Sequence, residues 1–345
     1  MKSLKEDYYS RSFSHIYVEK AAWRYLRTQK ILDKFQGAKI IEINHYKDIF
    51  CRRGQSYALQ HQTQNLLLAV KQGNLIYKGA PVCQNFGNRH FYYASCMMNC
   101  IYDCEYCYLK GMYPSGNIVI FVNLEDIFFE TENLLKNHPV YLCVSYDTDL
   151  PAMEEVTGYV EAWTQFAKRQ ENLNLEIRTK SANKIWMKQN PVSQVIYAFT
   201  LSPEAIIRSC EHNTPSLKQR IGCAAEAVLR GFSVRLCFDP MVYCTDWEKH
   251  YEAMLESVFS EIDMDKISDV SVGVFRISQD YLKRMKKNEP YSAVAQFPYQ
   301  NIGGVYQYPR ELAERMERFM SDRLKEKIPE EKIFFWKSIS EENYV

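Results

Sequence analysis

The sequence predicts an α/β protein: a partial (β/α)6-type TIM barrel with an N-terminal α/β extension. Two observations favour this fold. From about residue 90 onward, short apolar runs typical of strands alternate with longer amphipathic segments typical of helices. A chain of 345 residues, 46% of them hydrophobic, can also bury a core of that size. Alternating strands and helices favour parallel strands with right-handed crossovers, and about six or seven such units fit a barrel better than an open sheet, which stays the alternative.

The elements of the barrel can be placed from periodicity and turn residues. The expected strands are Phe91–Ala94, Ile118–Val122, Val140–Ser145, Leu175–Arg178, Val195–Thr200, Val234–Phe238 and Val270–Phe275. The expected helices lie near residues 124–137, 152–170, 182–189, 204–210, 216–230 and 246–262. Two of these helices carry start signals, because Ser216 with Gln219 and Thr245 with Glu248 match the capping box. Gly231 is expected to end the first of the two.

The same two helices each have one apolar face, which we expect to pack against the sheet. The faces consist of Leu217, Ile221, Ala224 and Val228 in the first helix, and of Trp247, Tyr251, Leu255 and Ile262 in the second.

We expect three parts along the chain. Residues 1–85 form an N-terminal α/β cap, residues 86–320 the barrel, and residues 321–345 a C-terminal tail. The elements expected in the cap are strands at Ile16–Val18 and Lys39–Ile43 and a helix over about Lys20–Phe35, which Gly37 ends.

The charge balance and the cysteines limit the class of protein. The chain carries 43 basic and 42 acidic residues, so its net charge of +1 attracts it neither to nucleic acid nor to a membrane. The N-terminus lacks the apolar core of a signal peptide, and no run approaches the about 20 apolar residues of a membrane span. Eleven cysteines are too sparse for a small disulfide scaffold. We therefore expect a cytoplasmic protein whose cysteines are free or bind metal.

Three cysteines, Cys100, Cys104 and Cys107, follow the first barrel strand at C-x-x-x-C-x-x-C spacing. In a barrel of this type, that position lies where active sites collect, at the carboxyl ends of the strands. Three thiolates can hold a cubic [4Fe-4S] cluster and leave its fourth iron open. A zinc site and a redox thiol group are the alternatives, but zinc usually takes four ligands and a second C-x-x-C is missing. Cys96 offers a rival spacing, which we disfavour because only the first three cysteines give the full pattern.

This spacing, with Tyr108 after the last cysteine, is the signature of the radical S-adenosylmethionine (SAM) superfamily. Within it, the chain resembles spore photoproduct lyase and its close homologues over about residues 14–320. The segments that carry the resemblance are Cys104–Lys110, Asn117–Asn123, Cys143-Val144-Ser145, Arg178-Thr179-Lys180, Phe199-Thr200, Asp239–Tyr243 and Trp247-Glu248. The implied fold is a partial barrel of the radical SAM kind.

The resemblance implies a DNA-repair lyase that reverses the spore photoproduct, a methylene-bridged thymine dimer, to two thymines through a 5′-deoxyadenosyl radical. The implied cofactors are a [4Fe-4S] cluster on Cys100, Cys104 and Cys107 and S-adenosyl-L-methionine, which supply the difficult chemistry. The implied partners are damaged DNA and an external reductant such as flavodoxin or ferredoxin.

The resemblance also assigns roles to single residues. Cys143 would return a hydrogen atom to the thymine radical, and Tyr106 and Tyr108 would relay hydrogen so that SAM is regenerated. The residues that would contact SAM are Ser145, Lys180 and Thr200. The alternatives are that Cys143 is a small core residue and that Lys180 is a solvated cation at a strand end, but the position of Cys143 at a strand end favours a functional role.

The chain departs from the family's pattern at a predicted SAM contact and, more seriously, where the substrate is held. Thr200 stands where the family has serine, which preserves the hydroxyl group. Near Tyr299, the chain lacks the Arg-Tyr pair with which well-studied lyases grip the lesion. One alternative is therefore a radical SAM enzyme of the same lineage with another nucleic-acid or small-molecule substrate. Another is a cluster or zinc protein that binds nucleic acid without catalysis.

A lesion flipped out of DNA would need basic groups beside the opening of the barrel. The candidates are Lys283, Arg284, Lys286, Lys287 and Arg310.

Overall fold

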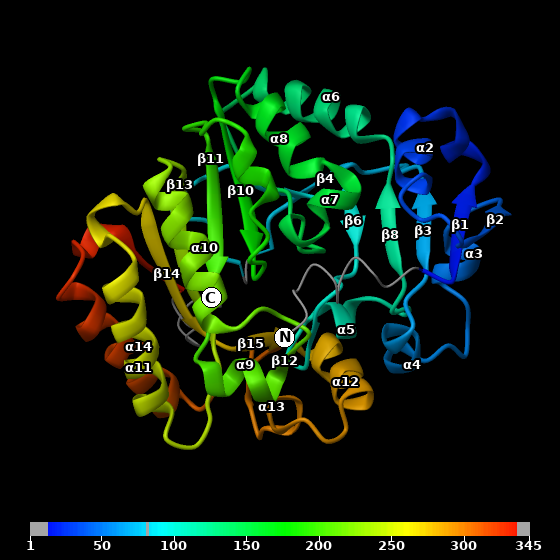
Figure 1. The fold of residues 1–345 in the computed structure, drawn as a ribbon. Coiled ribbons are helices and arrows are strands. Elements are labelled where there is room, and N and C mark those ends of the chain that lie inside the picture. Colours follow the sequence, from blue (N-terminus) through cyan, green and yellow to red (C-terminus); the bar gives the residue numbers. More distant parts are fainter. Residues whose placement is uncertain (1–12, 81–82, 337–345) are drawn as a thin grey trace.

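Six of the seven strands expected in the barrel region lie in a mixed eight-stranded sheet in the computed structural model, which describes residues 13–80 and 83–336 (Figure 1). The order across the sheet is β18 (Ile333–Phe335), β14 (Asp269–Val274), β13 (Ser233–Met241), β11 (Val195–Thr200), β10 (Leu173–Thr179), β9 (Val140–Cys143), β5 (Phe91–Ala94) and β4 (Ile76–Lys78). Neighbours pair in parallel from β18 to β5, and β4 pairs antiparallel with β5. The carboxyl ends of the parallel strands therefore lie along one edge.

A second, five-stranded sheet contains the N-terminal strands. Its order is β2 (Lys39–Ile43), β1 (His15–Glu19), β3 (Leu66–Ala69), β8 (Ile118–Phe121) and β6 (Met97–Met98). Ile118–Val122, expected among the barrel strands, is β8 and lies outside the large sheet, where β5 pairs directly with β9. Instead β8 pairs in parallel with β3, and all four residues of each strand are buried. Both strands are apolar throughout, which is typical of strands whose two faces are both buried.

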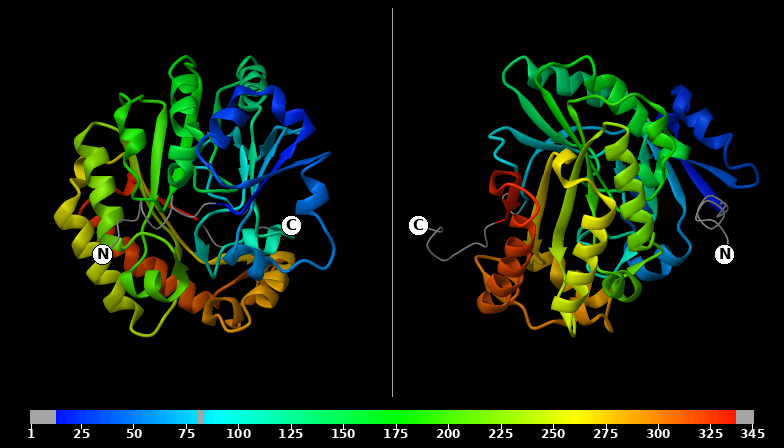
Figure 2. Two further views of the ribbon diagram at one scale, coloured as in Figure 1. Left: turned by 45° about the vertical axis from the view of Figure 1, so that its right-hand side comes forward. Right: turned by 60° about the vertical axis from the view of Figure 1, so that its left-hand side comes forward.

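Helices cover the outside of the strands, which occupy the middle of the molecule (Figure 2). The longer ones are α6 (Leu124–Leu135), α8 (Tyr159–Ala167), α10 (Leu217–Leu229), α11 (Trp247–Glu261), α12 (Gln279–Asn288) and α14 (Arg310–Lys325). Among them, α8 packs on β10, α10 on β13 and α14 on β14. The helix expected near 152–170 is broken, because Gly158 adopts a left-handed φ of 65° between α7 (Glu154–Thr157) and α8. The one expected near 182–189 is a short 3-10 turn, Ile185–Lys188.

One of the two expected capping boxes is confirmed and the other is wrong. Ser216 and Gln219 satisfy each other's backbone N–H groups at the start of α10. Helix α11 instead begins after Asp246, which is left-handed and makes no side-chain cap bond, so Thr245 lies one residue too early. The expected apolar faces are confirmed, since all eight residues are buried: Leu217, Ile221, Ala224, Val228, Trp247, Tyr251, Leu255 and Ile262.

The N-terminal strands are confirmed, but the helix expected over about Lys20–Phe35 is interrupted. Tyr25 is extended and separates a 3-10 turn, Lys20–Arg24, from α2 (Leu26–Leu32). Because β3 pairs with β8, residues on both sides of position 85 share a sheet. Helix α14 crosses position 320, β18 lies beyond it, and residues 337–345 of the expected tail lie outside the described residues. The three-part division of the chain stays a prediction.

Short elements gather at the carboxyl edge of the large sheet. They include α4 (Tyr57–Gln62), β7 (Asp103–Cys104), α5 (Leu109–Met112), α9 (Glu204–Cys210) and β12 (Glu211–His212). A three-stranded sheet of β15 (Arg276–Ser278), β17 (Val305–Gln307) and β16 (Gln300–Ile302) also lies there, with α13 (Ala293–Gln296) (Figure 1). The remaining short helix, α3 (Lys47–Phe50), follows β2.

Within the described ranges, every helix is too short or too polar to cross a membrane.

Helices α5 and α12 approach each other so closely that only glycine fits at position 111. A Cβ atom there would lie 2.3 Å from the carbonyl oxygen of Tyr281 and 2.6 Å from its Cα. We therefore expect Gly111→Ala to lower the free energy of unfolding by about 1–3 kcal/mol, since backbone atoms of α12 have to move. Urea denaturation followed by circular dichroism measures the change.

Gly222→Ala is the matched control. Gly222 lies inside α10 and a Cβ there meets open space, so the substitution is expected to raise the free energy of unfolding by about 0.5–1 kcal/mol. Equal effects of the two substitutions would contradict the close approach.

Candidate active site

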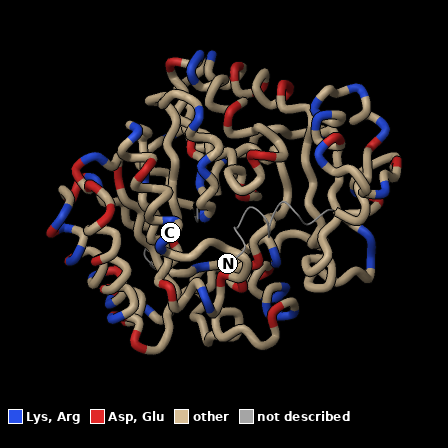
Figure 3. Tube along the Cα trace, viewed as in Figure 1, with Lys and Arg blue, Asp and Glu red and all other residues tan. Residues whose placement is uncertain are grey.

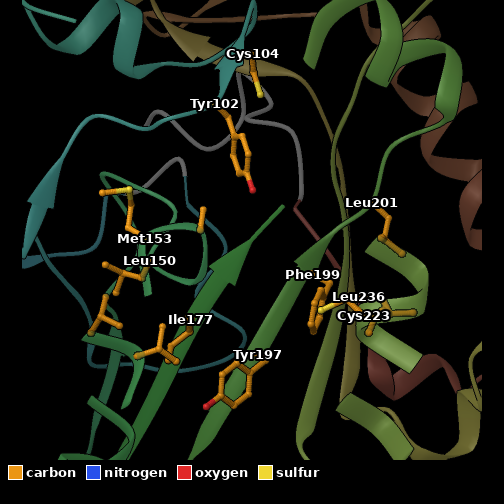
Figure 4. Packing of buried hydrophobic residues seen from close by; sticks show 14 of the residues in the cluster. Tyr102, Cys104, Leu150, Met153, Ile177, Tyr197, Phe199, Leu201, Cys223 and Leu236 are labelled. Carbon is orange, nitrogen blue, oxygen red and sulfur yellow. The ribbon is translucent and has the colours of Figure 1, made fainter. Parts of the chain in front are cut away.

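The three cysteines of the predicted cluster motif lie together at the carboxyl edge of the sheet. In Figure 4, Cys104 and its neighbour Tyr102 lie beyond the ends of the strands that carry Ile177 and Phe199. The N–H group of Cys107 donates to the carbonyl of Cys104 at 3.1 Å, which folds the loop back on itself. All eleven cysteines of the chain are free. The loop therefore presents three unpaired thiols at the place where such folds carry their chemistry.

Burial and charge act in opposite directions on the pKa of these thiols. Burial raises the pKa of Cys100, Cys104 and Cys107, and neighbouring cysteines of the loop add to it for Cys100 and Cys104. The charge of Lys180 lowers the pKa of Cys104 and Cys107 and so favours their thiolates. Iron binding displaces the protons and removes the cost of burying thiolates.

The loop geometry also bears on the zinc alternative and on Cys96. In the described residues, no three His, Cys, Asp or Glu side chains converge on one point as ligands of a single metal ion. A [4Fe-4S] cluster needs no such point, because each thiolate binds a different iron. Cys96 is fully buried, and its sulfur contacts the carbonyl of Val144 at 3.5 Å.

A short strand pairing holds one side of the loop. Glu211 of β12 lies opposite Cys104 of β7, and the N–H group of Glu105 donates to the carbonyl of Cys210 at 2.8 Å. The ring of His212 lies 2.9 Å from the carboxylate of Glu105. We call this pairing of β7 with β12 the brace. The sequence analysis missed it, because two-residue strands separated by about a hundred positions leave no periodic signal.

The brace carries a buried ion pair that reaches Tyr106. The hydroxyl of Tyr106 donates to the carboxylate of Glu211, which also accepts from Ser202 at 2.7 Å and pairs with Arg220. Burial alone would raise the pKa of Glu211, but the charges of Arg220 and Lys180 and these hydrogen bonds lower it to about 2. Arg220, itself fully buried, also donates to the Pro215 carbonyl at 3.0 Å. Tyr106 is thus tied to a permanently ionised carboxylate.

A second buried cation holds the other side of the loop. Lys110, which is 2% exposed, pairs with Asp103 at 2.6 Å and with Glu289, which directly follows α12. His61 of α4 contacts the carbonyl of Cys100 at 3.2 Å through Nε2 and lies 3.7 Å from Asp103. Lys110 was part of the recognised motif, but nothing in its spacing indicated that it is buried and paired on both sides.

Cys143, the predicted hydrogen donor, is the last residue of β9 and is buried. Its sulfur lies 3.8 Å from a carboxylate oxygen of Glu176 on the neighbouring strand β10. Glu176 is paired with Arg235 at 2.6 Å and with Arg178 at 3.2 Å. Burial and the negative charge of Glu176 both raise the pKa of Cys143 well above its usual value. The residue is therefore held as a neutral thiol, the form that can give up a hydrogen atom.

The two predicted relay tyrosines flank Cys107 and point to different neighbours. Tyr108 donates a hydrogen bond to the carbonyl of Tyr146, three residues beyond Cys143, and their ring centroids are 5.4 Å apart. Tyr106 faces Glu211, and the ammonium group of Lys180 lies 5.4 Å from its ring centroid. Tyr108 thus lies on the side of the segment that carries Cys143, and Tyr106 on the side of Lys180. Among the described residues, no contact joins Cys143 directly to either tyrosine.

The three predicted SAM contacts lie at the ends of neighbouring strands. The hydroxyl of Ser145 accepts from the N–H group of Arg178 at 2.6 Å. The backbone of Lys180 donates to Asp149 at 2.7 Å, which leaves its ammonium group near Tyr106 and the cysteines. Thr200 ends β11, and its carbonyl accepts from Arg220 at 3.3 Å. The fold therefore brings Lys180 to the cysteine loop, while Ser145 is engaged by the backbone next to it.

Tyr299, where the lesion-gripping pair was sought, belongs to an aromatic cluster. It is buried, its hydroxyl donates to the Val294 carbonyl at 2.8 Å, and its ring packs against three others: Phe275, Phe297 and Tyr308.

Removing Arg220 tests whether its ion pair holds the brace. We expect Arg220→Met to lower the free energy of unfolding by about 3–5 kcal/mol, because Glu211 stays buried without its cation. In the wild type, the lowered pKa of Glu211 stabilises the fold fully above pH 4.5, and this is lost toward pH 2. In the variant, burial raises the pKa of Glu211, so stability falls as pH rises, and the deficit is larger at pH 8 than at pH 5.

Arg208→Met is the control, measured by urea denaturation at both pH values. Arg208 forms an exposed pair with Glu204 one helical turn away at 3.1 Å, and its loss is expected to cost at most about 0.5 kcal/mol. A deficit of Arg220→Met that is no larger, or that shrinks with rising pH, would contradict the assignment.

Comparisons with known proteins agree with this geometry. A curated spore photoproduct lyase from Clostridium acetobutylicum is 23% identical over 242 residues, which are 65% of this chain and 70% of that protein. A solved spore photoproduct lyase complexed with dinucleoside spore photoproduct superposes with a TM-score of 0.78 at 18% identity, covering 94% of this chain and all of that one. A variant with bound AdoMet and the same dinucleoside gives 0.77 at 18% identity, covering 93% and 97%.

These two structures show the likeness of the fold. The model of the family described as spore photoproduct lyase matches residues 12–337, nearly the whole chain. The chain therefore belongs to the spore photoproduct lyase family.

Proposed function

We propose that this protein repairs DNA by reversing the spore photoproduct to two thymines, with a [4Fe-4S] cluster and SAM as cofactors. One observation carries the proposal: the cysteine loop, Lys180 and the buried thiol of Cys143 all lie at the carboxyl edge of one parallel sheet. When bound, the two cofactors together supply a 5′-deoxyadenosyl radical, which starts the reaction by removing a hydrogen atom from the lesion. The relatives bound to dinucleoside spore photoproduct favour this substrate over another nucleic acid or a small molecule.

The candidate site residues have separate roles in binding the two cofactors. Cys100, Cys104 and Cys107 hold the cluster. Lys180 offers a compact cation for the carboxylate of SAM, and Ser145 and Thr200 supply further polar contacts from the neighbouring strand ends. A flavodoxin or ferredoxin supplies the electron. The parallel strands from β5 to β18 act as a partial barrel of the radical SAM kind around this site, with residues 1–85 as its cap.

Cys143 is the hydrogen donor. Its raised pKa keeps the S–H bond intact, and the paired carboxylate of Glu176 cannot take the proton readily because it is held by two arginines. After the donation, the sulfur of Cys143 lacks its hydrogen atom and has to regain one. Tyr108 lies toward Cys143 and Tyr106 toward Lys180, so the two are ordered for returning hydrogen from the SAM side to the sulfur.

The function is tested by giving the anaerobically reconstituted, reduced protein SAM and dinucleotide spore photoproduct. We expect release of thymidine-containing product by the wild type. Cleavage of SAM without repair of the dinucleotide would leave only the alternative substrates, and no cleavage of SAM would contradict both enzyme functions.

Replacing Cys143 by alanine should change the product rather than the first step. Cys143→Ala is expected to cleave SAM and consume the lesion, but to divert the thymine radical to adducts, since its hydrogen donor is missing. Mass spectrometry of the products measures this. The control is Cys237→Ala, another buried strand cysteine, which we expect to yield the normal product. Normal product from Cys143→Ala would exclude it as the donor.

The ligand assignment predicts different iron contents for two alanine variants. Cys104→Ala should lose most of the iron and the visible absorption of the reconstituted cluster, because one thiolate anchor is gone. Cys96→Ala should retain both, because its sulfur contacts Val144 rather than the loop. Iron analysis and absorption spectra distinguish them. Loss of iron in Cys96→Ala alone would reverse the assignment.

A further inference from the structure

Helix α12 presents an exposed basic surface that the proposed chemistry does not use. It consists of Lys283, Arg284, Lys286 and Lys287, which we call the α12 basic surface. Three of the four are exposed and Lys286 is half-buried, and none has a carboxylate partner in the part of the chain that the structure describes. Figure 3 shows basic segments on this helix, among others along the chain. The net charge of the chain is only +1, so the α12 basic surface is a local concentration of positive charge. Its charge is available to an anionic partner.

This surface is rigidly connected to the cysteine loop. Lys110 of α5 pairs with Glu289 at the end of α12, and Asn288 donates to the Lys110 carbonyl at 2.8 Å. Arg284 donates to the Gly111 carbonyl at 3.2 Å, and the helices touch at Gly111 with no room for a side chain. Since α5 directly follows Cys107, a partner bound on α12 is held at a fixed position relative to the cluster motif.

An aromatic side chain stands beside the basic surface. Tyr291, three residues beyond the end of α12, is 99% exposed, which is unusual for so large a ring. Basic groups next to an exposed aromatic ring are the combination that binds nucleic acid, through phosphates and through stacking on bases. Arg310, the other basic candidate, instead pairs with Glu314 on α14 at 2.7 Å.

We propose that the α12 basic surface and Tyr291 bind the DNA strand that flanks the lesion, and so anchor the duplex beside the active site. The proposal rests on the proposed function, because it takes DNA as the substrate. Lys283, Lys286 and Lys287 contact phosphates, and Tyr291 stacks on a base that is unpaired next to the flipped lesion. Arg284 mainly holds α12 to α5 and is therefore left intact in the test.

The test measures binding of the reconstituted protein to a fluorescein-labelled DNA duplex by anisotropy, at several salt concentrations. The variant is Lys283→Gln with Lys286→Gln and Lys287→Gln. Each lost phosphate contact is expected to reduce the slope of log K against log salt by about 1, and hence by about 3 in total. Tyr291→Ala is expected to weaken binding of labelled single-stranded DNA at least about fivefold.

The control variant removes three other exposed, unpaired basic side chains outside α12: Lys168→Gln, Arg169→Gln and Lys188→Gln. It should keep the wild-type slope within about 1. An equal fall in both triple variants would show a general charge effect and overturn the proposal. A wild-type slope in the α12 variant would also overturn it. If that variant instead slows reduction by flavodoxin, the surface belongs to an acidic electron carrier.

Turnover distinguishes this inference from the proposed function. A dinucleotide lacks flanking phosphates, so the ratio of kcat/KM for a lesion-containing duplex to that for the dinucleotide is expected to fall at least about tenfold in the α12 variant. An unchanged ratio would overturn the inference. Failure of the wild type on the dinucleotide would contradict the proposed function itself, while the salt slope would still decide whether α12 binds DNA.

Discussion

The structure depends above all on two buried cations that hold the cysteine loop. The loop has only two residues in a strand, so its own backbone bonds cannot fix three thiols in place. Arg220 with Glu211 holds one side and Lys110 with Asp103 holds the other. Burying a charge is costly unless partners satisfy it, and each cation here has several. Removing any one partner leaves an unpaired buried charge next to the site. Because an unpaired buried charge is costly, these pairs keep the loop in a single arrangement.

Two other charged residues, Lys180 and Glu176, act on the neighbouring thiols. Lys180 favours the thiolates of the loop, whereas the paired Glu176 keeps Cys143 protonated. Thiols that would bind iron and a thiol that would donate hydrogen thus lie in one site with opposite electrostatic surroundings. Tyr106 donates a hydrogen bond to ionised Glu211, and Tyr108 donates one to the carbonyl of Tyr146.

Local patterns predicted single elements well and their arrangement less well. Strand β11 and helix α9 lie within the expected bounds, because periodicity and turn residues act over a few positions. Strand β8 was expected in the barrel but lies in the other sheet. An apolar run indicates that a strand is buried, but it does not indicate which strand it pairs with. The expected capping box at Thr245 failed because a left-handed residue, Asp246, moved the start of α11 by one position.

The sequence by itself determined the spacing of Cys100, Cys104 and Cys107, the strands that follow one another along the chain, and through them the family. These features are short-range, so a motif or a period reports them directly. Only the tertiary structure decided that Glu211 and Lys110 hold the loop, and that α12 lies against it. Tyr106 and Glu211 are 105 positions apart, and Lys110 and Glu289 are 179 positions apart. A charged residue also looks the same in sequence whether it is solvated or buried beside its partner.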